Sequence, residues 1–453
     1  MTSPNKRVKE TPIDRLSALP DCLIIHILSL LEVKQSAITA LLSKRWQFLW
    51  TQSPRLIFSE KRIWIQPPEV QDFVTRMNRT LVICGPNDLD TFELECPYSE
   101  IYNPDVNGWV GFAVKSKAKQ LSLLLNRFSC DHCTLPRTMF QSAYLKRLKL
   151  RGCVVEPWGT IEWPSLTELS IEDSELQQPA MEKMLSGCPA LHCLVLEDCR
   201  GFNRLEVSSK SLYELRVSDP KEYEDDNEPL LQISAPYLHT LSVTLYPKGR
   251  KLCLENTPSL VKATIEFVAC GWDTGIEEVM DHVEELLEKI CHVKVVDLRC
   301  NFIEVLSWVA TNDYRFPQSA RTSLSVEAPT VKCSIHVLVG LLESSPNLEA
   351  LVIEGCHTDW EPCTYLDSKL DLECDLLHLK SIVIKDFTGP NLVGEPMLTL
   401  ARILLNKLPE LDKMVIHNKI FTSSSQPDVD ESSNIAQKLL SYPKSSKAVI
   451  LLK

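Results

Sequence analysis

A short apolar motif recurs along most of this chain and constrains its fold more than any other feature. The motif has the form apolar-x-x-apolar-x-apolar, and successive copies begin about 21 to 33 residues apart. Chance produces a few such copies in a leucine-rich chain, but it does not produce a dozen at similar intervals. The copies are Leu89/Phe92/Leu94, Ala118/Leu121/Leu123, Leu145/Leu148/Leu150, Leu166/Leu169/Ile171, Leu191/Leu194/Leu196, Leu212/Leu215/Val217, Leu238/Leu241/Val243, Leu260/Ala263/Ile265, Val293/Val296/Leu298, Leu348/Leu351/Ile353, Leu379/Ile382/Ile384 and Leu411/Met414/Ile416, with a degenerate copy at Arg321/Leu324/Val326.

Each copy predicts a short β-strand, because alternate residues of a strand point to opposite faces. The second and third apolar residues of the motif then point inward, and the residue between them points outward. One strand cannot bury its own inner face, whereas stacked copies build a continuous core. The intervals are typical of leucine-rich repeats, some of them stretched. The sequence therefore predicts an α/β fold, a leucine-rich-repeat solenoid of irregular curvature with a parallel sheet.

Helical patterns and corner residues lie between the strands. Apolar residues share one helical face over residues 276–290 and again over 397–405, where Pro396 precedes the pattern. We expect these helices on the convex side, packed against the sheet. Small residues follow several strands three positions after the last apolar residue of the motif, and we expect them in tight corner turns. They are Cys153, Cys199, Cys356 and Ser174.

Composition excludes several classes of function. The formal charge is −12 and the isoelectric point is near 5.4, so non-specific nucleic-acid binding is disfavoured. The longest apolar run is too short to cross a membrane, and the polar N-terminus lacks the apolar region of a secretory signal. We therefore expect a chain of the nucleus or cytoplasm. Its 17 cysteines are then expected to be reduced and to act as small buried apolar side chains.

Residues 14–50 have a different, helical pattern. Pro20 suits the start of a helix, which continues through an apolar stripe from Leu23 to Leu31. A second short helix is expected over 37–42, and a third, capped by Ser43, would place Trp46 and Trp50 one turn apart. Three such short helices cannot bury this much apolar surface among themselves. Either they pack against the rest of the chain, or one apolar face binds a partner protein.

This segment resembles the F-box. The resemblance is carried by Leu19-Pro20, Ile27-Leu28-Ser29, Leu42-Ser43-Lys44-Arg45-Trp46 and Leu49-Trp50, whereas Glu32 stands where the family usually has proline. It implies binding to a Skp-type adaptor, which joins the chain to a cullin and a RING subunit. The implied adaptor-binding face consists of Leu19, Pro20, Leu23, Ile24, Ile27, Leu28, Leu42 and Trp46, with Lys44 and Arg45 at its rim to pair with acidic adaptor residues.

The C-terminal part resembles the FBD region of plant F-box proteins with leucine-rich repeats. The likeness covers the segment from Leu348, and also residues 109–123 and 135–153. It implies an F-box at 12–56, a solenoid at 57–345 and an FBD region at 346–453. After a polar break, residues 435–440 are expected to form a helix, followed by an edge strand that caps the sheet.

Candidate chemistry outside the N-terminal segment is sparse. Cys130, Asp131, His132 and Cys133 could supply metal ligands, but no second Cys/His pair lies at finger-like spacing, so we expect no metal. No catalytic motif or phosphate-binding loop is present, and we expect neither enzymatic activity nor a cofactor. Target contacts are sought on outward strand positions, where cross-strand charge pairing is the favoured alternative. The candidates are Arg147, Lys149, Arg151, Glu168, Glu172, Glu214 and Arg216, with Lys262 and Glu266 of the same grade.

The resemblances imply a function for the whole chain. It would be the substrate-recognition subunit of an SCF-type (Skp-cullin-F-box) ubiquitin ligase, holding an unknown target protein on its repeats. No nucleic acid and no membrane would take part. The alternatives are a ligase-independent interaction scaffold and a small-molecule-binding F-box receptor.

Overall fold

The computed structural model describes residues 16, 18–60, 67–127, 132–218, 230–246, 250–268, 276–309, 315–329, 332–356, 376–387, 394–408, 410–418, 441 and 449–452. The chain divides into two compact units, Met1–Leu191 and His192–Lys453.

The first unit begins with short helices. These are α1 (Asp21–Ser29), α2 (Val33–Ile38) and the 3-10 helices η1 (Thr39–Leu41) and η2 (Leu49–Gln52). Pro20 is the residue just before α1, with an extended backbone, so the helix starts one residue later than predicted. The predicted third α-helix is wrong, because Trp46 lies in a turn, Trp50 lies in η2, and the Ser43 hydroxyl caps nothing among the described residues.

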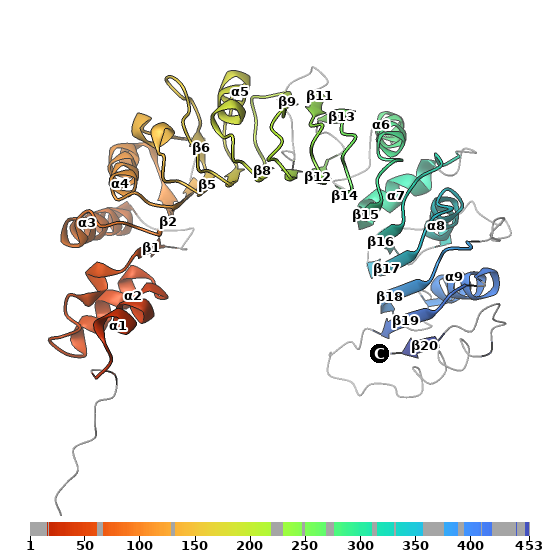
Figure 1. Cartoon of the computed structure of the whole chain (residues 1–453), viewed down its shortest axis with the longest axis horizontal. Helices are drawn as coiled ribbons and strands as arrows, with labels where there is room; N and C mark the ends of the chain where they lie inside the picture. Colours follow the sequence, from red (N-terminus) through yellow and green to blue (C-terminus); the bar gives the residue numbers. More distant parts are fainter. Residues whose placement is uncertain are drawn as a thin grey trace, which may run out of the picture. The chain divides into compact units, whose positions relative to one another are not determined.

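A parallel sheet follows in the same unit. Its strands lie in chain order as β1 (Arg55–Ser59), β2 (Thr91–Tyr98), β3 (Gln120–Arg127), β5 (Arg147–Arg151) and β7 (Glu168–Glu172). The short strands β4 (Cys133–Thr134) and β6 (Cys153–Val154) pair separately. The connecting helices are α3 (Pro67–Cys84), η3 (Glu100–Tyr102), α4 (Asn103–Lys115), η4 (Arg137–Gln141) and α5 (Gln178–Gly187). Figure 1 shows α3 and α4 beside the first strands of this sheet.

The second unit repeats the arrangement with more strands. In order of pairing they are β8 (Cys193–Glu197), β10 (Glu214–Ser218), β12 (Thr240–Leu245), β14 (Lys262–Phe267), β15 (Val295–Leu298), β16 (Ser323–Pro329), β17 (Ala350–Cys356), β18 (Ser381–Phe387), β19 (Lys413–Asn418) and β20 (Val449–Leu452). Helices α6 (Ile276–Lys289), α7 (Cys300–Val309), α8 (Lys332–Glu343) and α9 (Gly394–Lys407) line one side of these strands (Figure 1). Both predicted helices and the predicted final strand are confirmed, whereas the helix expected at 435–440 lies outside the described residues.

The repeating motif forms the core of both units. Every apolar residue in the twelve copies is at most 3% exposed, and so are Leu324 and Val326 of the degenerate copy. Arg321, at the first position of that copy, is also buried. Burial of one such leucine, isoleucine or valine side chain contributes roughly 1.5–3 kcal/mol. The core therefore runs continuously from strand to strand within each unit, as the motif predicts.

The corner turns are confirmed at the three predicted positions with described side chains. The side chains of Cys153, Ser174 and Cys199 each donate a hydrogen bond to the carbonyl oxygen two residues earlier. The residue before each of them has a positive φ, namely 72° at Gly152, 43° at Asp173 and 52° at Asp198. Glycine and aspartate tolerate this left-handed backbone better than most residues. The side chain of the fourth predicted corner residue, Cys356, lies outside the described set.

One layer was not predicted. The strands β9 (Arg204–Glu206), β11 (Leu230–Ser234) and β13 (Lys251–Asn256) form a small parallel sheet of their own in the second unit. Each contributes only a few buried residues, such as Leu205, Ile233 and Leu254. These strands lie outside the repeating motif, and their pairing partners lie in neighbouring repeats. Some of the connections between the main strands therefore contain short strands themselves.

Candidate functional site

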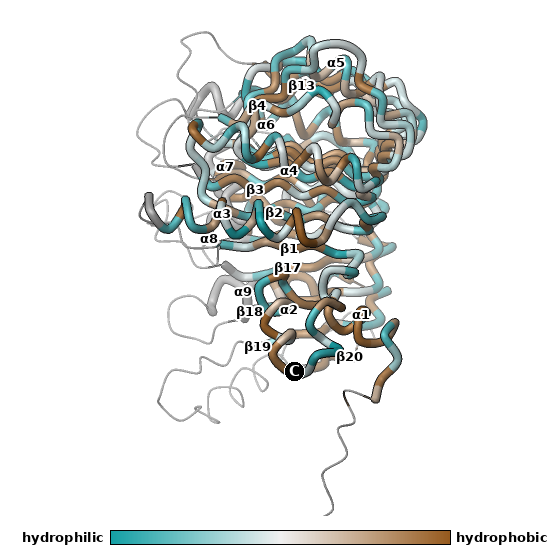
Figure 2. Tube along the Cα trace, turned by 90° about the vertical axis from the view of Figure 1, so that its left-hand side faces the viewer, coloured by the Kyte–Doolittle hydropathy of each residue, from teal (hydrophilic) through white to brown (hydrophobic). Residues whose placement is uncertain are grey.

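Helix α1 is apolar on two sides. Ile24 and Leu28 lie four residues apart and are fully buried. Leu23, Ile27 and Leu30 form a second stripe at helical spacing, and they are 48%, 39% and 62% exposed. In Figure 2 the tube of α1 is coloured mostly as hydrophobic. One stripe thus holds the helix in place, and the other is accessible.

The exposed stripe belongs to a wider apolar surface. Of twenty exposed large apolar side chains among the described residues, eight lie within residues 16–48. We call them the apolar face: Leu16, Leu23, Ile27, Leu30, Ile38, Leu41, Leu42 and Phe48. Leu41 is the most exposed, at 87%. Such a concentration of exposed apolar side chains is typical of a protein-binding surface.

The predicted adaptor-binding residues divide into two groups. Leu23, Ile27, Leu42 and Pro20 are exposed, and Leu19 is half-buried. In contrast, the side chains of Ile24, Leu28 and Trp46 are at most 3% exposed, so they support the apolar face from inside and cannot themselves be contacted. Burial of these three residues together with Leu49 and Trp50 gives the short helices an apolar interior.

Five members of the apolar face were not predicted: Leu16, Leu30, Ile38, Leu41 and Phe48. The spacing of Leu23, Ile27 and Leu30 is the signal that could have identified Leu30. Leu41 ends η1, a short helix whose exposed side is not evident from its three-residue sequence.

The predicted charged rim is present, with a partner inside the chain. Lys44 is exposed. Arg45 donates hydrogen bonds from Nε and Nη2 to Oδ1 of Asp21, over 3.0 Å and 2.5 Å. Both side chains are at least 40% exposed, so this ion pair contributes little stability and does not prevent a change of partner.

The short helices are also anchored to the first repeat. Helix α2 contacts β1, and η2 contacts α3. Val33, at the start of α2, is 6% exposed. Glu32 precedes it with φ −61°, an angle that proline also adopts, so the turn before α2 keeps the geometry that proline would favour. The segment therefore packs against its own chain and still leaves an apolar face accessible.

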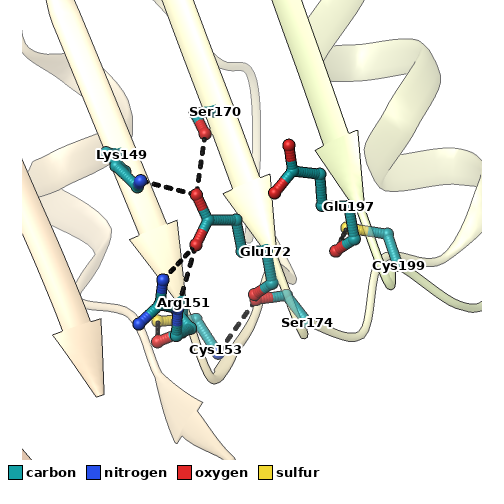
Figure 3. A network of polar contacts seen from close by, with 8 residues as sticks. All are labelled: Lys149, Arg151, Cys153, Ser170, Glu172, Ser174, Glu197 and Cys199. Atoms are coloured by element: carbon teal, nitrogen blue, oxygen red, sulfur yellow. Dashed lines mark hydrogen bonds and ion pairs between the residues drawn. The ribbon is translucent and has the colours of Figure 1, made fainter. Parts of the chain in front are cut away.

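The outward charges of β5 and β7 are paired with one another. Arg147 donates from Nε to Glu168 Oε1 over 3.0 Å. Lys149 lies 2.6 Å from Glu172 Oε1, and Arg151 donates from Nε and Nη2 to Glu172 Oε2 (Figure 3). The predicted cross-strand pairing is thus confirmed, and a role of these residues in target binding stays a prediction.

The pKa of Glu172 reflects this network. Burial acts to raise the pKa of the carboxyl group, but hydrogen bonds from Lys149 and Arg151 outweigh burial and hold the pKa below its ordinary value. Ser170 donates a further, long hydrogen bond of 3.5 Å to Oε1. Glu172 is therefore a charged, structural link between two repeats.

The other outward candidates make local contacts. Arg216 donates from Nε to Glu214 Oε1 over 2.6 Å within the same strand, β10. Glu266 accepts a long hydrogen bond of 3.5 Å from Thr244, and Lys262 is exposed. A function for these four residues remains a prediction.

No group of three or more His, Cys, Asp or Glu side chains is arranged for a metal among the described residues. Cys130 and Asp131 lie outside that set, and Cys133 is buried, with its thiol donating to Asn103 Oδ1 over 3.2 Å. In the part of the chain that the structure covers, no helix combines the length and the apolar character needed to cross a bilayer.

Comparison with known proteins agrees with this geometry. Residues 16–58 match the F-box domain family, and residues 106–266 match the family described as FBD-associated F-box protein At5g56370, LRR repeats. Similar Arabidopsis thaliana proteins include the putative F-box/LRR-repeat protein At5g02930, 26% identical over 89% of this chain and 87% of its own length. The F-box/LRR-repeat protein At4g14096 is 28% identical over 97% and 94%, and the F-box/FBD/LRR-repeat protein At5g56420 is 28% identical over 83% and 86%.

A short helical domain with an exposed apolar face, followed by stacked parallel strands, defines a repeat protein with a helical N-terminal domain. With the matches above, the chain contains an F-box domain and leucine-rich repeats of the FBD-associated type, and it is similar over most of its length to F-box/LRR-repeat proteins of Arabidopsis thaliana.

Proposed function

We propose that this chain is the substrate-recognition subunit of an SCF-type ubiquitin ligase. Its F-box binds a Skp-type adaptor through the apolar face, and the adaptor connects it to a cullin and a RING subunit. The repeats hold a target protein while another subunit transfers ubiquitin. The chain itself carries no catalytic site in this proposal.

The observation that supports the proposal best is the pair of stripes on α1. A helix needs only one apolar side to pack within its own domain, and the Ile24 and Leu28 side supplies it. The second, exposed apolar side lowers the solubility of the protein unless a partner covers it. The charges of Lys44 and Arg45 beside this surface suit an acidic partner and would contribute mainly to orientation and association rate.

The expected energy of docking follows from exposure. Leu41 and Leu42 are 87% and 62% exposed, so each has much of its side chain available for burial. Covering one leucine contributes roughly 1.5–3 kcal/mol, and each 1.4 kcal/mol corresponds to about a tenfold change in affinity. Replacing both leucines by charged residues should therefore weaken adaptor binding by at least about a hundredfold.

The test is an adaptor pull-down with variants whose folding is not at risk. Leu41→Glu with Leu42→Glu changes only exposed side chains, whereas Leu19→Ala with Pro20→Ala also alters the residue before α1. Val82→Glu on α3 is the matched control, because Val82 is 82% exposed and lies outside the F-box. We expect the double variant to lose the adaptor and the control to retain it. Equal recovery of all three proteins would support a ligase-independent scaffold instead.

The finer parts of the proposal carry their own expectations. The domain limits are those expected from the sequence, an F-box at 12–56, repeats at 57–345 and an FBD region at 346–453. The site of action would be the nucleus or the cytoplasm, which fractionation of cells expressing the tagged chain would check. A small-molecule receptor would instead show a ligand-dependent rise in melting temperature.

A further inference from the structure

A polar hollow lies at the edge of the first unit where its strands begin. Its volume is about 550 Å³. Positive charge comes from Arg55, Lys119, Lys146 and Arg147, and Asp90 adds a negative charge. The hollow is thus a locally basic surface on a chain whose formal charge is −12. We call it the basic hollow.

The backbone places these side chains in a regular row. Arg55, Thr91, Gln120 and Arg147 are direct partners in the register of β1, β2, β3 and β5. Neighbouring strands are about 4.8 Å apart, so the two arginines are separated by roughly 14 Å. Lys119 and Lys146 directly precede β3 and β5, and the Lys146 N–H donates to the Lys119 carbonyl oxygen over 2.7 Å. The repeat geometry therefore fixes the spacing of the cations.

Two of the four cations are available for a ligand. Lys119 pairs with Asp90 over 2.7 Å, and Arg147 pairs with Glu168 over 3.0 Å. Within the described parts of the chain, neither Arg55 nor Lys146 has an ion-pair partner. The paired cations are about half exposed, so their ion pairs are weak and can be exchanged. The neighbouring charges of Lys149 and Arg151 are, by contrast, taken up by the buried Glu172.

The spacing favours an extended polyanion over a single small anion. The backbone positions of these cations span roughly 14 Å, so several acidic groups along the same length match them better than one phosphate or carboxylate group. In an extended peptide, side chains on one face recur about every 6.6–6.8 Å, so the same length presents about three acidic groups. A short acidic segment fits within the hollow, whereas a nucleic acid would extend its phosphates beyond it over a chain whose formal charge is −12, which disfavours a nucleic acid as this ligand.

We propose that the basic hollow binds an acidic peptide segment in extended conformation, laid across the starts of β1 to β5. Only the identification of this segment as part of the target protein rests on the proposed function. Binding of an acidic peptide to the basic hollow does not depend on it. The acidic groups are carboxylates or phosphates, which share the chemistry that arginine and lysine recognise. Binding weakens as salt rises, because the contacts are exposed charges.

The test measures fluorescence anisotropy of labelled peptides with the purified full chain. The probes are a peptide of alternating Glu and Ser, the same peptide with phosphoserine, a matched Gln and Ser peptide, and a labelled single-stranded RNA. Arg55→Gln with Lys146→Gln removes the two unpaired charges. Lys294→Gln with Lys380→Gln is the matched control, because these lysines directly precede β15 and β18 and are exposed. The control therefore removes two positive charges from the starts of strands elsewhere in the chain.

We expect an acidic peptide to bind the natural chain and the control equally, and to bind the Arg55 and Lys146 variant at least tenfold more weakly. Preference for the phosphoserine or for the Glu peptide then identifies which acidic group is recognised. Equal affinity for all three proteins, binding of the Gln peptide as tightly as the acidic ones, or tighter binding of single-stranded RNA would overturn the proposal. An adaptor pull-down with the same variants separates this proposal from the proposed function, because neither Arg55 nor Lys146 belongs to the apolar face, and adaptor binding should therefore be unchanged.

Discussion

Arg321 occupies a position that is apolar in each of the twelve copies recognised from the sequence. In the strand register it is aligned with Val293 and Leu348, which are fully buried, and Arg321 itself is 2% exposed. Its Nε donates to Ser319 Oγ over 2.5 Å, whereas its Nη1 has no hydrogen-bond partner among the described residues. Burial lowers the pKa of the guanidinium group to about 10. Arg321 is thus a buried charged group that is only partly hydrogen-bonded within the described residues.

Arg321→Met should therefore stabilise the second unit. Methionine keeps the unbranched length of the side chain, so little cavity is left, and it removes the unpaired charge. Replacing buried ionic groups by well-packed apolar ones gains about 1–4 kcal/mol. Loss of the hydrogen bond to Ser319 offsets about 1 kcal/mol of this. We expect a net gain of about 2 kcal/mol, or a rise of roughly 4–8 °C in melting temperature for a unit of this size.

Urea and thermal unfolding, followed by circular dichroism, would measure the effect of Arg321→Met. Arg402→Met is the matched control, because Arg402 on α9 is exposed and the same substitution there should change stability by less than about 0.5 kcal/mol. A loss of stability in Arg321→Met would refute the reasoning, since it would mean that the guanidinium group has a compensating partner.

Three further predictions concern the repeats and the cysteines. Lys149 and Arg151 hold the pKa of Glu172 below its ordinary value of 4.5. The ion pairs of Glu172 therefore contribute to the free energy of unfolding at neutral pH, and this contribution is lost as the pH falls below about 4.5. Glu172→Gln should lower the free energy of unfolding by about 1 kcal/mol at pH 7 and should reduce its decrease at acidic pH, as measured by urea titrations. The same decrease at acidic pH in both proteins would contradict this. Gly187→Ala should destabilise the protein by about 2 kcal/mol, because a Cβ at this position would overlap the carbonyl oxygen of Ile161. Gly108→Ala on α4 is the control: its Cβ would meet no atom within 4 Å, and the substitution should stabilise the protein by about 0.5–1 kcal/mol in the same assay. Among the described cysteines, Cys22 is exposed, whereas Cys153, Cys188 and Cys199 are buried. Burial also raises the pKa of the Cys188 thiol to about 12. Among these four, brief alkylation followed by mass spectrometry should therefore find Cys22 modified first. Faster labelling of Cys188 would contradict the packing.

The sequence predicts the strands well because their signal is repeated. Leu148 alone would not identify a strand, but its place in a motif that recurs a dozen times does. Even Arg321 could be aligned, because Leu324 and Val326 follow it at the motif spacing. Strand β1 was missed, since its copy has Ser53 at the first position, although Leu56 and Phe58 are buried like the others.

The site is predicted less well, for a physical reason. Helix α1 is apolar on both sides, so hydrophobic periodicity cannot tell which stripe is buried. Resemblance identifies Leu23 and Leu28 alike, whereas the structure separates the exposed residue from the buried one. The basic hollow was not predicted, because Arg55 and Lys146 are 91 residues apart in sequence and are brought together only by the stacking of repeats.

Calorimetric titration of the purified chain with a Skp-type adaptor tests the central claim most directly. If the apolar face is the adaptor site, one adaptor should bind per chain, with a negative heat-capacity change from burial of apolar surface. Both the binding and that heat-capacity change should disappear in Leu41→Glu with Leu42→Glu. Absence of binding to the natural chain, or binding that persists in the double variant, would contradict the account.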